Sequence, residues 1–379
     1  MKAFLLAGEV SGDRLGGALM AGLKELRDDM EFHGIGGEQM QSHGLTSLFP
    51  MEELSIMGLA EVLPKYFHLK RRIRETADEI LRLKPDVVIT IDAPDFSLRV
   101  AKLVKEASNI RTVHYVAPSV WAWRPKRAAK MAKVIDHVLA LLPFEPPYMT
   151  AHGMECDFVG HPVTTEVQAT DAEAADFRAR FGIGDAPLIL ALPGSRRGEV
   201  SRLADRFGAA LAQVVADKPK AKIVLPCAAP VAQLVRDLTA NWAVQPILLD
   251  PSEMTAADKR AAFKAADIAL AASGTVSLEL AAARTPMVIA YDFNKITWAI
   301  MRRMALIDTF TLVNLVSETR AVPEFLGPEC RPELIAPAIL SVLNDPTAQR
   351  SAMDVTMQRL GEGGEAPGLR AARAVLARL

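Results

Sequence analysis

Short apolar runs alternate with helix-like stretches along most of this chain, and this alternation constrains its fold more than any other feature. In the first half, clear apolar runs occur at residues 2–7, 86–91, 112–116 and 138–142. The first run is followed by a Gly-rich turn, after which we expect a helix from about Gly16. Apolar strands that alternate with helices predict a parallel sheet with crossover helices, which is the α/β class.

The pattern pauses at a Gly-His-Pro-Val segment, residues 160–163, and then starts again. Further strands are predicted at 188–192, 222–225, 246–249, 268–271 and 287–290, with helices between most of them, such as 201–216 and 277–283. A chain of 379 residues is long enough to bury two cores. We therefore expect two doubly wound, Rossmann-like domains, 1–165 and 166–349. A C-terminal helix, about 350–379, packs back on the first domain or on a partner chain.

Composition excludes several classes of protein. The formal net charge of -1 argues against a protein that binds nucleic acid through bulk charge. The three cysteines, Cys156, Cys227 and Cys330, lack metal-ligand spacing, and reduced thiols in a cytosolic enzyme are the simplest interpretation. No secretory signal is evident, and no apolar run approaches the roughly 18 residues of a membrane span.

Two loops of the second half have features of phosphate-binding sites. LPGSR, residues 192–196, ends a predicted strand with a Gly, a Ser and an Arg, and guanidinium groups form paired bonds with diphosphates. SGTVSLE, residues 273–279, opens a predicted helix whose free N–H groups attract anions. In a nucleotide-sugar site, Glu279 can accept bonds from both ribose hydroxyls. The alternatives are a plain turn with solvated arginines and an ordinary helix cap.

Two carboxylates stand at a strand end in the first half. Asp92 ends the strand of residues 86–91, Pro94 suits an early helical position, and Asp95 then falls in the first turn of the helix. Spacing alone leaves two interpretations of Asp95 open. It is either a general base or a carboxylate that stabilises the helix dipole by about 0.3–1 kcal/mol.

The ordered set of motifs resembles one family. The set comprises GEVSGD at 8–13, IDAPDF at 91–96, PSVWAW at 118–123, GHP at 160–162, LPGSR at 192–196, SGTVSLE at 273–279 and VPEFL at 322–326. This set resembles the lipid-A-disaccharide synthases, which are glycosyltransferases of the GT-B fold. Two positions depart from the family pattern: Val10 replaces a small Ala, and Val313 replaces a Pro, which puts the placement of Asn314 in question.

The resemblance implies a fold, a reaction and a location. The fold is two Rossmann-like domains that face a central cleft. The reaction condenses UDP-2,3-diacylglucosamine with 2,3-diacylglucosamine 1-phosphate, with inversion, to the β-1,6-linked lipid A disaccharide 1-phosphate and UDP. The enzyme is expected in the cytoplasm, in peripheral contact with the inner face of the inner membrane. A homodimer is one alternative for its oligomeric state.

The resemblance also implies roles for individual residues. Asp95 is expected to be the base, with Asp92 as its partner or as the base instead. The residues expected to bind the donor UDP and its phosphates are Ser195, Arg196, Ser273, Gly274, Thr275, Glu279 and Asn314. Ser11, Gly12 and Asp13, on the first strand–helix loop, are expected near a substrate sugar, with a helix cap as the alternative. No metal-binding Asp pair is present in the expected place, so we expect no cofactor and full activity in EDTA.

Residues 55–74 combine apolar and basic side chains, as interfacial segments do. The residues expected to contact the membrane are Ile56, Leu59, Leu63, Phe67, Arg71 and Arg72. Pro64 is expected to kink or break the helix. The alternative is an amphipathic helix that packs on its own sheet. A second basic stretch, residues 124–133, either binds the acceptor phosphate or is a solvated face.

Three rival functions share parts of this pattern. A UDP-sugar epimerase or hydrolase has the same use for the SGTVSLE loop, but no reason for the apolar and basic segment. A transferase acting on a peptidoglycan lipid has different donor loops. A membrane protein that merely binds UDP-sugar has no reason for paired carboxylates at a strand end.

Overall fold

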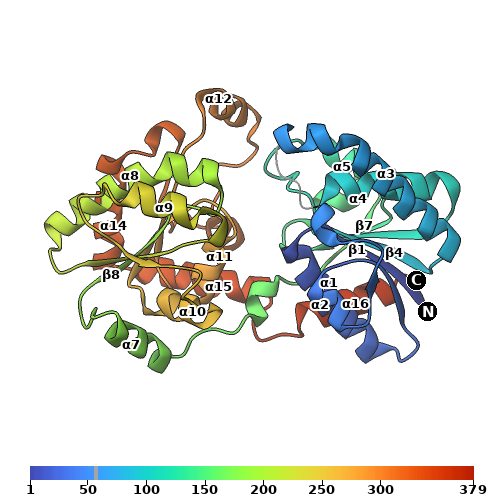
Figure 1. Cartoon of the computed structure of the whole chain (residues 1–379), viewed down its shortest axis with the longest axis horizontal. Coiled ribbons are helices and arrows are strands. Elements are labelled where there is room, and N and C mark those ends of the chain that lie inside the picture. The colour runs from blue at the N-terminus through green and yellow to red at the C-terminus, as the bar shows by residue number, and fades with distance from the viewer. Residues whose placement is uncertain (55–58) are drawn as a thin grey trace. The chain divides into compact units, whose positions relative to one another are not determined.

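The computed structural model describes residues 1–54 and 59–379, which form two compact units (Figure 1). Unit 1 comprises Met1–Thr165 together with Leu360–Leu379, and unit 2 comprises Glu166–Arg359. The predicted second domain ended at 349, whereas unit 2 extends to Arg359. Both ends of the chain therefore belong to unit 1.

Unit 1 contains a seven-stranded parallel sheet in the order β3-β2-β1-β4-β5-β6-β7. Its strands are β1 Lys2–Ala7, β2 Glu31–Ile35, β3 Thr46–Ser47, β4 Val87–Ile91, β5 Arg111–Tyr115, β6 His137–Ala140 and β7 Glu155–Phe158. The central strand β4 is buried along its whole length, and its apolar run is typical of a strand covered on both faces.

Helices cover both faces of this sheet. They are α1 Val10–Leu26, α2 Glu38–Ser42, α3 Leu59–Leu83, α4 Pro94–Ala107, α5 Lys126–Met131, α6 Pro146–Thr150 and α16 Pro367–Leu376. Figure 1 shows α1, α2 and α16 on one face and α3, α4 and α5 on the other. The C-terminal helix α16 packs on α1 of its own chain. A Cβ atom on Gly22 of α1 would lie 2.8 Å from the carbonyl oxygen of Gly368, so glycine is needed for this close approach.

Unit 2 contains a six-stranded parallel sheet in the order β10-β9-β8-β11-β12-β13. Its strands are β8 Leu188–Leu192, β9 Lys222–Pro226, β10 Ile247–Leu249, β11 Ile268–Ala272, β12 Met287–Tyr291 and β13 Glu324–Leu326. Its helices are α7 Asp171–Arg180, α8 Arg197–Asp217, α9 Ala232–Thr239, α10 Ala256–Ala265, α11 Val276–Ala282, α12 Lys295–Met304, α13 Leu312–Ser317, α14 Pro332–Asn344 and α15 Thr347–Leu360. The predicted α/β class with two doubly wound sheets is confirmed.

The structure corrects three predictions about individual elements. Strands β2, β3, β7 and β13 were not predicted, and three of them are edge strands, which lack a continuous apolar run because neighbours cover them less. Helix α1 begins at Val10, not near Gly16. Helix α3 continues through Pro64, so the expected break is wrong. Pro64 lies in the second turn of α3, where a missing N–H removes one hydrogen bond near the helix start.

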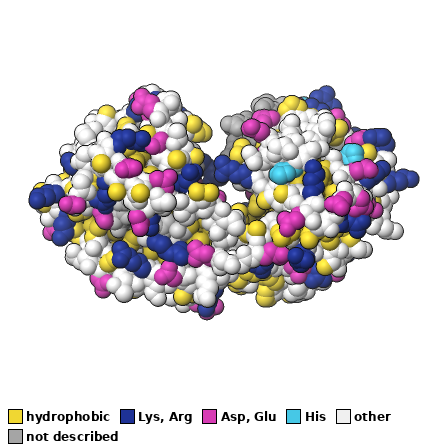
Figure 2. All heavy atoms as spheres, turned by 90° about the horizontal axis from the view of Figure 1, so that it is seen from below, with side chains coloured by type: hydrophobic (Ala, Val, Ile, Leu, Met, Phe, Trp, Pro, Cys, Tyr) yellow, Lys and Arg dark blue, Asp and Glu magenta, His cyan; other side chains and the backbone are white. Residues whose placement is uncertain are grey.

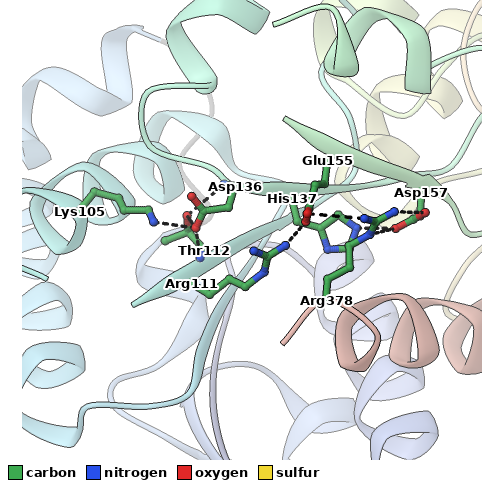
Figure 3. Close-up of polar contacts among 8 residues, drawn as sticks. All are labelled: Lys105, Arg111, Thr112, Asp136, His137, Glu155, Asp157 and Arg378. Atoms are coloured by element: carbon green, nitrogen blue, oxygen red, sulfur yellow. Dashed lines mark hydrogen bonds and ion pairs between the residues drawn. The ribbon is translucent and has the colours of Figure 1, made fainter. Parts of the chain in front are cut away.

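The C-terminus is held to the sheet of unit 1 by a polar network (Figure 3). The Arg378 guanidinium donates to both carboxylate oxygens of Asp157 on β7, at 2.7 and 3.0 Å. Asp157 also contacts Nε2 of the buried His137 on β6, at 2.8 Å. Glu155, on β7 as well, pairs with Arg111 at the start of β5 and lies 3.6 Å from Arg378. These contacts join three neighbouring strands to the end of the chain.

A second group of contacts in Figure 3 fixes the start of the same strands. Asp136 accepts hydrogen bonds from the Lys105 ammonium at 2.6 Å and from the backbone N–H of Thr112 at 2.9 Å. This carboxylate is half-buried, and these bonds hold its pKa below the usual range although burial acts in the opposite direction. The network therefore ties the end of α4 to β5 and β6.

Basic and acidic side chains are mixed over the face that Figure 2 presents, in keeping with the net charge of -1. This mixture does not resemble the one-signed surface of a protein that binds a polyanion. Within residues 1–54 and 59–379, no helix is both long enough and apolar enough to cross a bilayer.

Candidate active site

Both sheets reverse their strand order at one point, and the sequence motifs lie there. In unit 1 the order reverses between β1 and β4, and in unit 2 it reverses between β8 and β11. Ligands of doubly wound sheets bind beyond the carboxyl ends of the strands at such switch points. GEVSGD and IDAPDF end β1 and β4, whereas LPGSR and SGTVSLE end β8 and β11. Each unit therefore has a group of candidate residues at its own switch point, and these two groups are called the unit 1 half-site and the unit 2 half-site.

The unit 1 half-site is built on strained backbone. Asp92 and Ala93, which follow β4, have φ angles of 49° and 45°, and Val116, which follows β5, has a φ angle of 84°. Such positive angles are uncommon for residues other than glycine, and for a β-branched valine they are a true outlier. Backbone strain of this kind concentrates at functional sites. A Cβ atom on Gly8 would lie 2.9 Å from that of Ala93, so the two switch-point loops are in close contact.

The two carboxylates at the end of β4 differ in their surroundings. Asp92 is half-buried, and its backbone is fixed by hydrogen bonds to Tyr115 and from the Ser97 hydroxyl, at 3.0 and 2.8 Å. Asp95 is exposed in the first turn of α4, as the position of Pro94 predicted. Among the residues that the structure describes, neither carboxylate has a hydrogen-bonded partner. Both are therefore available to a substrate hydroxyl.

Residues 11–13 lie in the first turn of α1 and not on a loop, which corrects their predicted placement. Ser11 is exposed, whereas Gly12 is buried, where a Cβ atom would lie 3.5 Å from the carbonyl oxygen of Ile91. Asp13 is only 4% exposed. Its carboxylate does not cap α1.

The Asp13 carboxylate accepts three backbone hydrogen bonds from the start of α2. The donors are the N–H groups of Gly37, Gln39 and Met40, at 2.8, 2.9 and 3.0 Å. A carboxylate with three amide donors is a strong structural link between α1 and the loop after β2. This geometry favours a positioning role for Asp13, a role that no periodicity in the sequence indicates.

Replacing Asp13 with alanine is expected to lower the free energy of unfolding of unit 1 by about 2–4 kcal/mol, because three buried N–H groups lose their acceptor. Urea-induced unfolding measures this loss. Asp13→Asn keeps one acceptor oxygen and should lose less. Arg14→Ala, at the exposed neighbouring position, is the matched control and should be neutral. An equal stability of Asp13→Ala and the control would contradict this role.

The PSVWAW motif is held by a buried glutamate that sequence reasoning missed. Trp121 donates its indole N–H to Glu145 at 3.2 Å and meets the Phe144 ring edge-on, at 5.1 Å between centroids. Glu145 follows β6 and also accepts the N–H groups of Leu141 and Leu142, at 3.2 and 3.0 Å. The loops that end β5 and β6 are thus joined by one carboxyl group.

Burial raises the pKa of Glu145 to about 7, although its hydrogen-bond donors favour the charged form. The folded pKa then exceeds the unfolded one, so the protonated group stabilises the fold below pH ~4.5 and this stabilisation is lost as the pH rises toward 7. Between about pH 5 and 7 the loss should be roughly 2 kcal/mol. Glu145→Gln, which cannot ionise, should show an unfolding free energy with a correspondingly flatter pH profile. Parallel profiles for the two proteins would exclude this titration.

In the unit 2 half-site, backbone N–H groups of the LPGSR loop point at the carboxylate of Glu199 on α8. Gly194 has a φ angle of 115°, and a Cβ atom there would lie 2.6 Å from the Glu199 carboxylate. Glu199 accepts the N–H groups of Ser195 and Arg196 at 3.3 Å, and the Arg196 guanidinium lies 3.5 Å away. Bonds of this length are weak, so a phosphate can compete for these donors.

The SGTVSLE loop presents exposed groups at the end of β11. Ser273 is half-buried and Gly274 and Thr275 are exposed, while the Ser277 hydroxyl donates to the Gly274 carbonyl at 2.8 Å. Glu279 pairs with Lys259 of α10 at 2.7 Å through one carboxylate oxygen. The sequence did not indicate Lys259, because it lies twenty residues away on another helix. This ion pair fixes the orientation of the Glu279 carboxylate.

The structure revises the role of Asn314, which was predicted to contact the donor. Its side chain is 1% exposed on α13. The amide NH₂ donates to the Val322 carbonyl and to Glu324, at 2.9 and 3.0 Å, and the amide oxygen accepts the Val322 N–H at 3.0 Å. Glu324, in the VPEFL motif, also accepts the Phe310 N–H at 2.9 Å. With its donors and acceptor in use, Asn314 ties α13 to the segment that follows it and has no group left for a ligand.

The GHP motif lies where the chain crosses between the two units. The N–H of His161 donates to the Leu360 carbonyl at 3.2 Å, and its Nδ1 accepts the Val163 N–H at 3.2 Å. A Cβ atom on Gly160, which has a φ angle of 88°, would lie 3.2 Å from that same carbonyl. The motif thus holds the end of the first segment of unit 1 against Leu360, where the second segment of that unit begins.

Of the predicted membrane residues, some lie outside the described residues, two are exposed, and one is held in an ion pair. Ile56 and the side chains of Leu59 and Leu63 lie outside the described residues. Phe67 is 81% exposed on α3, and Arg71 is exposed too. Arg72, in contrast, is bound to both oxygens of Glu53 at 2.8 and 2.7 Å and lowers the pKa of that group to about 2. Arg72 therefore holds α3 to the preceding turn, which corrects its predicted lipid contact.

No group of three or more His, Cys, Asp or Glu side chains in the described part of the chain is arranged to hold a metal ion.

Comparisons with known proteins match almost the whole chain to one family. The sequence model described as "Lipid-A-disaccharide synthetase" matches residues 3–376. The lipid-A-disaccharide synthase of Ruegeria pomeroyi is 66% identical over 100% of this chain and 96% of its own, and that of Rhodospirillum centenum is 46% identical over 98% and 93%.

Solved structures of lower identity show the same fold. The UDP-GlcNAc 2-epimerase of Neisseria meningitidis, bound to UDP-GlcNAc, has a TM-score of 0.65 at 12% identity and covers 100% of this chain and 99% of its own. That of Methanocaldococcus jannaschii has a TM-score of 0.63 at 14% identity, with the same coverage. The fold is the two-domain GT-B type, and by its sequence the chain belongs to the lipid-A-disaccharide synthase family, a family of UDP-dependent glycosyltransferases.

Proposed function

We propose that this chain transfers a 2,3-diacylglucosamine unit from its UDP derivative to 2,3-diacylglucosamine 1-phosphate. The products are the β-1,6-linked disaccharide 1-phosphate and UDP. One observation carries the proposal: in a chain of this family, the paired carboxylates and the phosphate-type loops each lie at the switch point of their own sheet. The transfer needs groups of both kinds, a base for the acceptor hydroxyl and donors for the leaving diphosphate.

The unit 1 half-site supplies the base. The 6-hydroxyl of the acceptor attacks the anomeric carbon of the donor as the bond from that carbon to the β-phosphate oxygen breaks. The hydroxyl proton passes to Asp95, and the electron pair of the broken bond leaves with UDP. Such a single displacement inverts the anomeric centre. Asp95 is suited to this role because it is exposed and follows a strained loop, next to a second carboxylate, Asp92.

The unit 2 half-site stabilises the leaving group. Negative charge develops on the β-phosphate, and Arg196 and the N–H groups of the two loops are donors for that charge. Ser195, Ser273 and Thr275 supply further donors, while Glu279, oriented by Lys259, accepts bonds from the ribose hydroxyls. We propose that this donor set acts without a metal ion or other cofactor.

The acyl chains of both substrates require contact with a membrane. We propose that the exposed Phe67 and Arg71 of α3 face the inner surface of the inner membrane from the cytoplasm. In the unit 1 half-site, we propose that the exposed Ser11 faces the acceptor sugar.

The test is an incubation of the purified chain with both diacylglucosamine substrates in detergent micelles that contain EDTA. Mass spectrometry follows the lipid product, and UDP release is measured in parallel. Disaccharide phosphate formed at the same rate with and without EDTA supports the proposal. Loss of activity in EDTA would exclude metal independence. UDP released without disaccharide indicates a hydrolase, and UDP-sugar binding without turnover indicates a binding protein.

A further inference from the structure

Helix α12 of unit 2 exposes a cluster of large hydrophobic side chains. Ile300 is 51% exposed, Met304 is 37% exposed, and Leu306, just beyond the helix end, is 59% exposed. Ile300 and Met304 are four residues apart, so they lie on the same face of the helix. Single exposed apolar residues are ordinary, but a cluster of them marks an interaction surface.

Basic side chains occupy the last turn of the same helix, with Arg303 beside the apolar face and Arg302 on the side of Trp298. Both arginines are exposed. Within the described part of the chain, neither guanidinium has a hydrogen-bonded or ion-paired partner. The next carboxylate along the chain, Asp308, is already paired with Arg320. The segment therefore combines exposed apolar groups with uncompensated positive charge.

The opposite side of α12 is fixed to its own unit. The Trp298 ring packs against Gly327, where a Cβ atom would lie 2.6 Å from the ring, and it stacks on Phe293 at 5.6 Å between centroids. The Asn294 side chain caps the helix by accepting the Thr297 N–H at 2.7 Å. With Trp298 held inward, the face of Ile300 and Met304 is left for another partner.

The residues on which α12 packs are in contact with the LPGSR loop. Phe293 contacts the Tyr291 ring at 4.7 Å between centroids, and the Tyr291 hydroxyl donates to Glu199 at 3.3 Å. Glu199 is the carboxylate that accepts the N–H groups of Ser195 and Arg196. A partner bound to α12 is therefore joined, through rings in contact, to the loop proposed to bind the donor phosphates.

We propose that the α12 surface, defined as Ile300, Met304, Leu306, Arg302 and Arg303, docks on an anionic lipid bilayer. Amphipathic helices with a basic component bind such surfaces by burying apolar side chains beside anionic headgroups. A second copy of the chain fits less well, because a two-fold contact would bring like-charged arginines together with no carboxylate between them. This inference rests on the proposed function, in which both substrates are membrane lipids, and it adds a second docking element to α3.

The experiment measures partition of the full chain into vesicles without any substrate. One set of vesicles contains equal parts of phosphatidylglycerol and phosphatidylcholine, and the other contains phosphatidylcholine alone. In the variant Ile300→Ser/Met304→Ser/Leu306→Ser, the partition constant for anionic vesicles should fall about tenfold or more, because less apolar area is buried. Helix α3 is the same in both proteins, so a difference in partition is due to the three substituted side chains.

The charge component is tested separately. Arg302→Gln/Arg303→Gln should weaken partition into anionic vesicles by about tenfold or more and leave phosphatidylcholine vesicles unaffected. Val167→Ser is the matched control, because Val167 is an exposed apolar residue of the same unit that is not on α12, and it should change nothing. Unaltered melting temperature and UDP affinity establish that the variants are folded.

Any of three results would overturn the proposal. In the first, the triple serine variant partitions like the unmodified chain. In the second, the unmodified chain fails to partition at all. In the third, sedimentation shows a dimer that the triple variant converts to a monomer, which assigns the surface to a second copy. Since no substrate is present, failure of the proposed function would appear only in the disaccharide assay, and failure of the α12 surface only in the vesicle assay.

Discussion

Replacement of Asp95 by asparagine is expected to lower kcat for disaccharide formation by about 10²–10⁴-fold, which is the usual contribution of a positioned general base. Asparagine preserves the shape of the side chain but cannot take the proton of the acceptor hydroxyl. Binding of the UDP-sugar should be unchanged, because the donor motifs belong to the other unit. Single-turnover kinetics and UDP-sugar titration of the same preparation separate the two effects.

Two further variants distinguish this role from its alternatives. Asp171→Asn removes an exposed carboxylate from the first turn of another helix, α7, and controls for loss of a helix-dipole interaction. It should leave kcat unchanged. Asp92→Asn keeps the left-handed backbone, which asparagine tolerates, and shows which carboxylate is the base. Should both Asp92→Asn and Asp95→Asn retain near-normal turnover, the base lies elsewhere.

All interior strands except β2 could be predicted from the sequence, because a parallel strand that is buried on both faces is a continuous apolar run. Strands β1 and β8 were predicted to the residue, since each is a continuous apolar run covered on both faces. Three of the four edge strands, β3, β7 and β13, were not predicted, whereas the fourth, β10, was. β7, with the sequence ECDF, has acidic residues at two of its four positions, and both form ion pairs instead of packing in a core.

The start of α1 was placed wrongly because tertiary packing outweighs helix propensity there. Gly12, Gly16 and Gly17 make the segment look like a turn, since glycine disfavours a helix interior. In the fold the last two of these positions leave little room for a side chain: a Cβ atom on Gly16 would lie 2.5 Å from the Met40 sulfur, and one on Gly17 would lie 3.2 Å from the Gln39 Cβ. Close contact between α1 and α2 thus requires glycine, and glycine is the residue type whose low helix propensity argued against a helix in this segment.

In the candidate sites too, features set by the local sequence could be predicted, whereas contacts between distant parts of the chain could not. The motif positions at strand ends followed from the alternation of strands and helices, so Asp92, Asp95 and the two phosphate-type loops could be found. The side chains that orient them could not, because Lys259 and Glu145 reach their partners across different elements. Asn314 was assigned to the ligand for the same reason, since its partners around Val322 become visible only in the fold.

Replacement of Arg196 by alanine is expected to lower kcat/KM by roughly 10²–10³-fold, which is the typical loss on removing a group that stabilises developing charge. The Arg196 side chain is 64% exposed, and its nearest carboxylate, Glu199, is 3.5 Å away. This weak pairing leaves the guanidinium available to a diphosphate, with which it can form two parallel hydrogen bonds. Because the side chain is exposed, the melting temperature of the variant should be unchanged.

The chain provides a matched control in the next residue. Arg197 is also an exposed arginine, but it is the first residue of α8, and Arg197→Ala should leave kcat/KM within about twofold. Arg196→Lys keeps the charge but loses the planar fork, so it should recover only part of the rate. UDP affinity, measured by calorimetry, should fall in the order unmodified chain, Arg196→Lys, Arg196→Ala. Equal losses for Arg196→Ala and Arg197→Ala would show that the loop acts through its overall charge, and the assignment of the leaving phosphate to Arg196 would then be wrong.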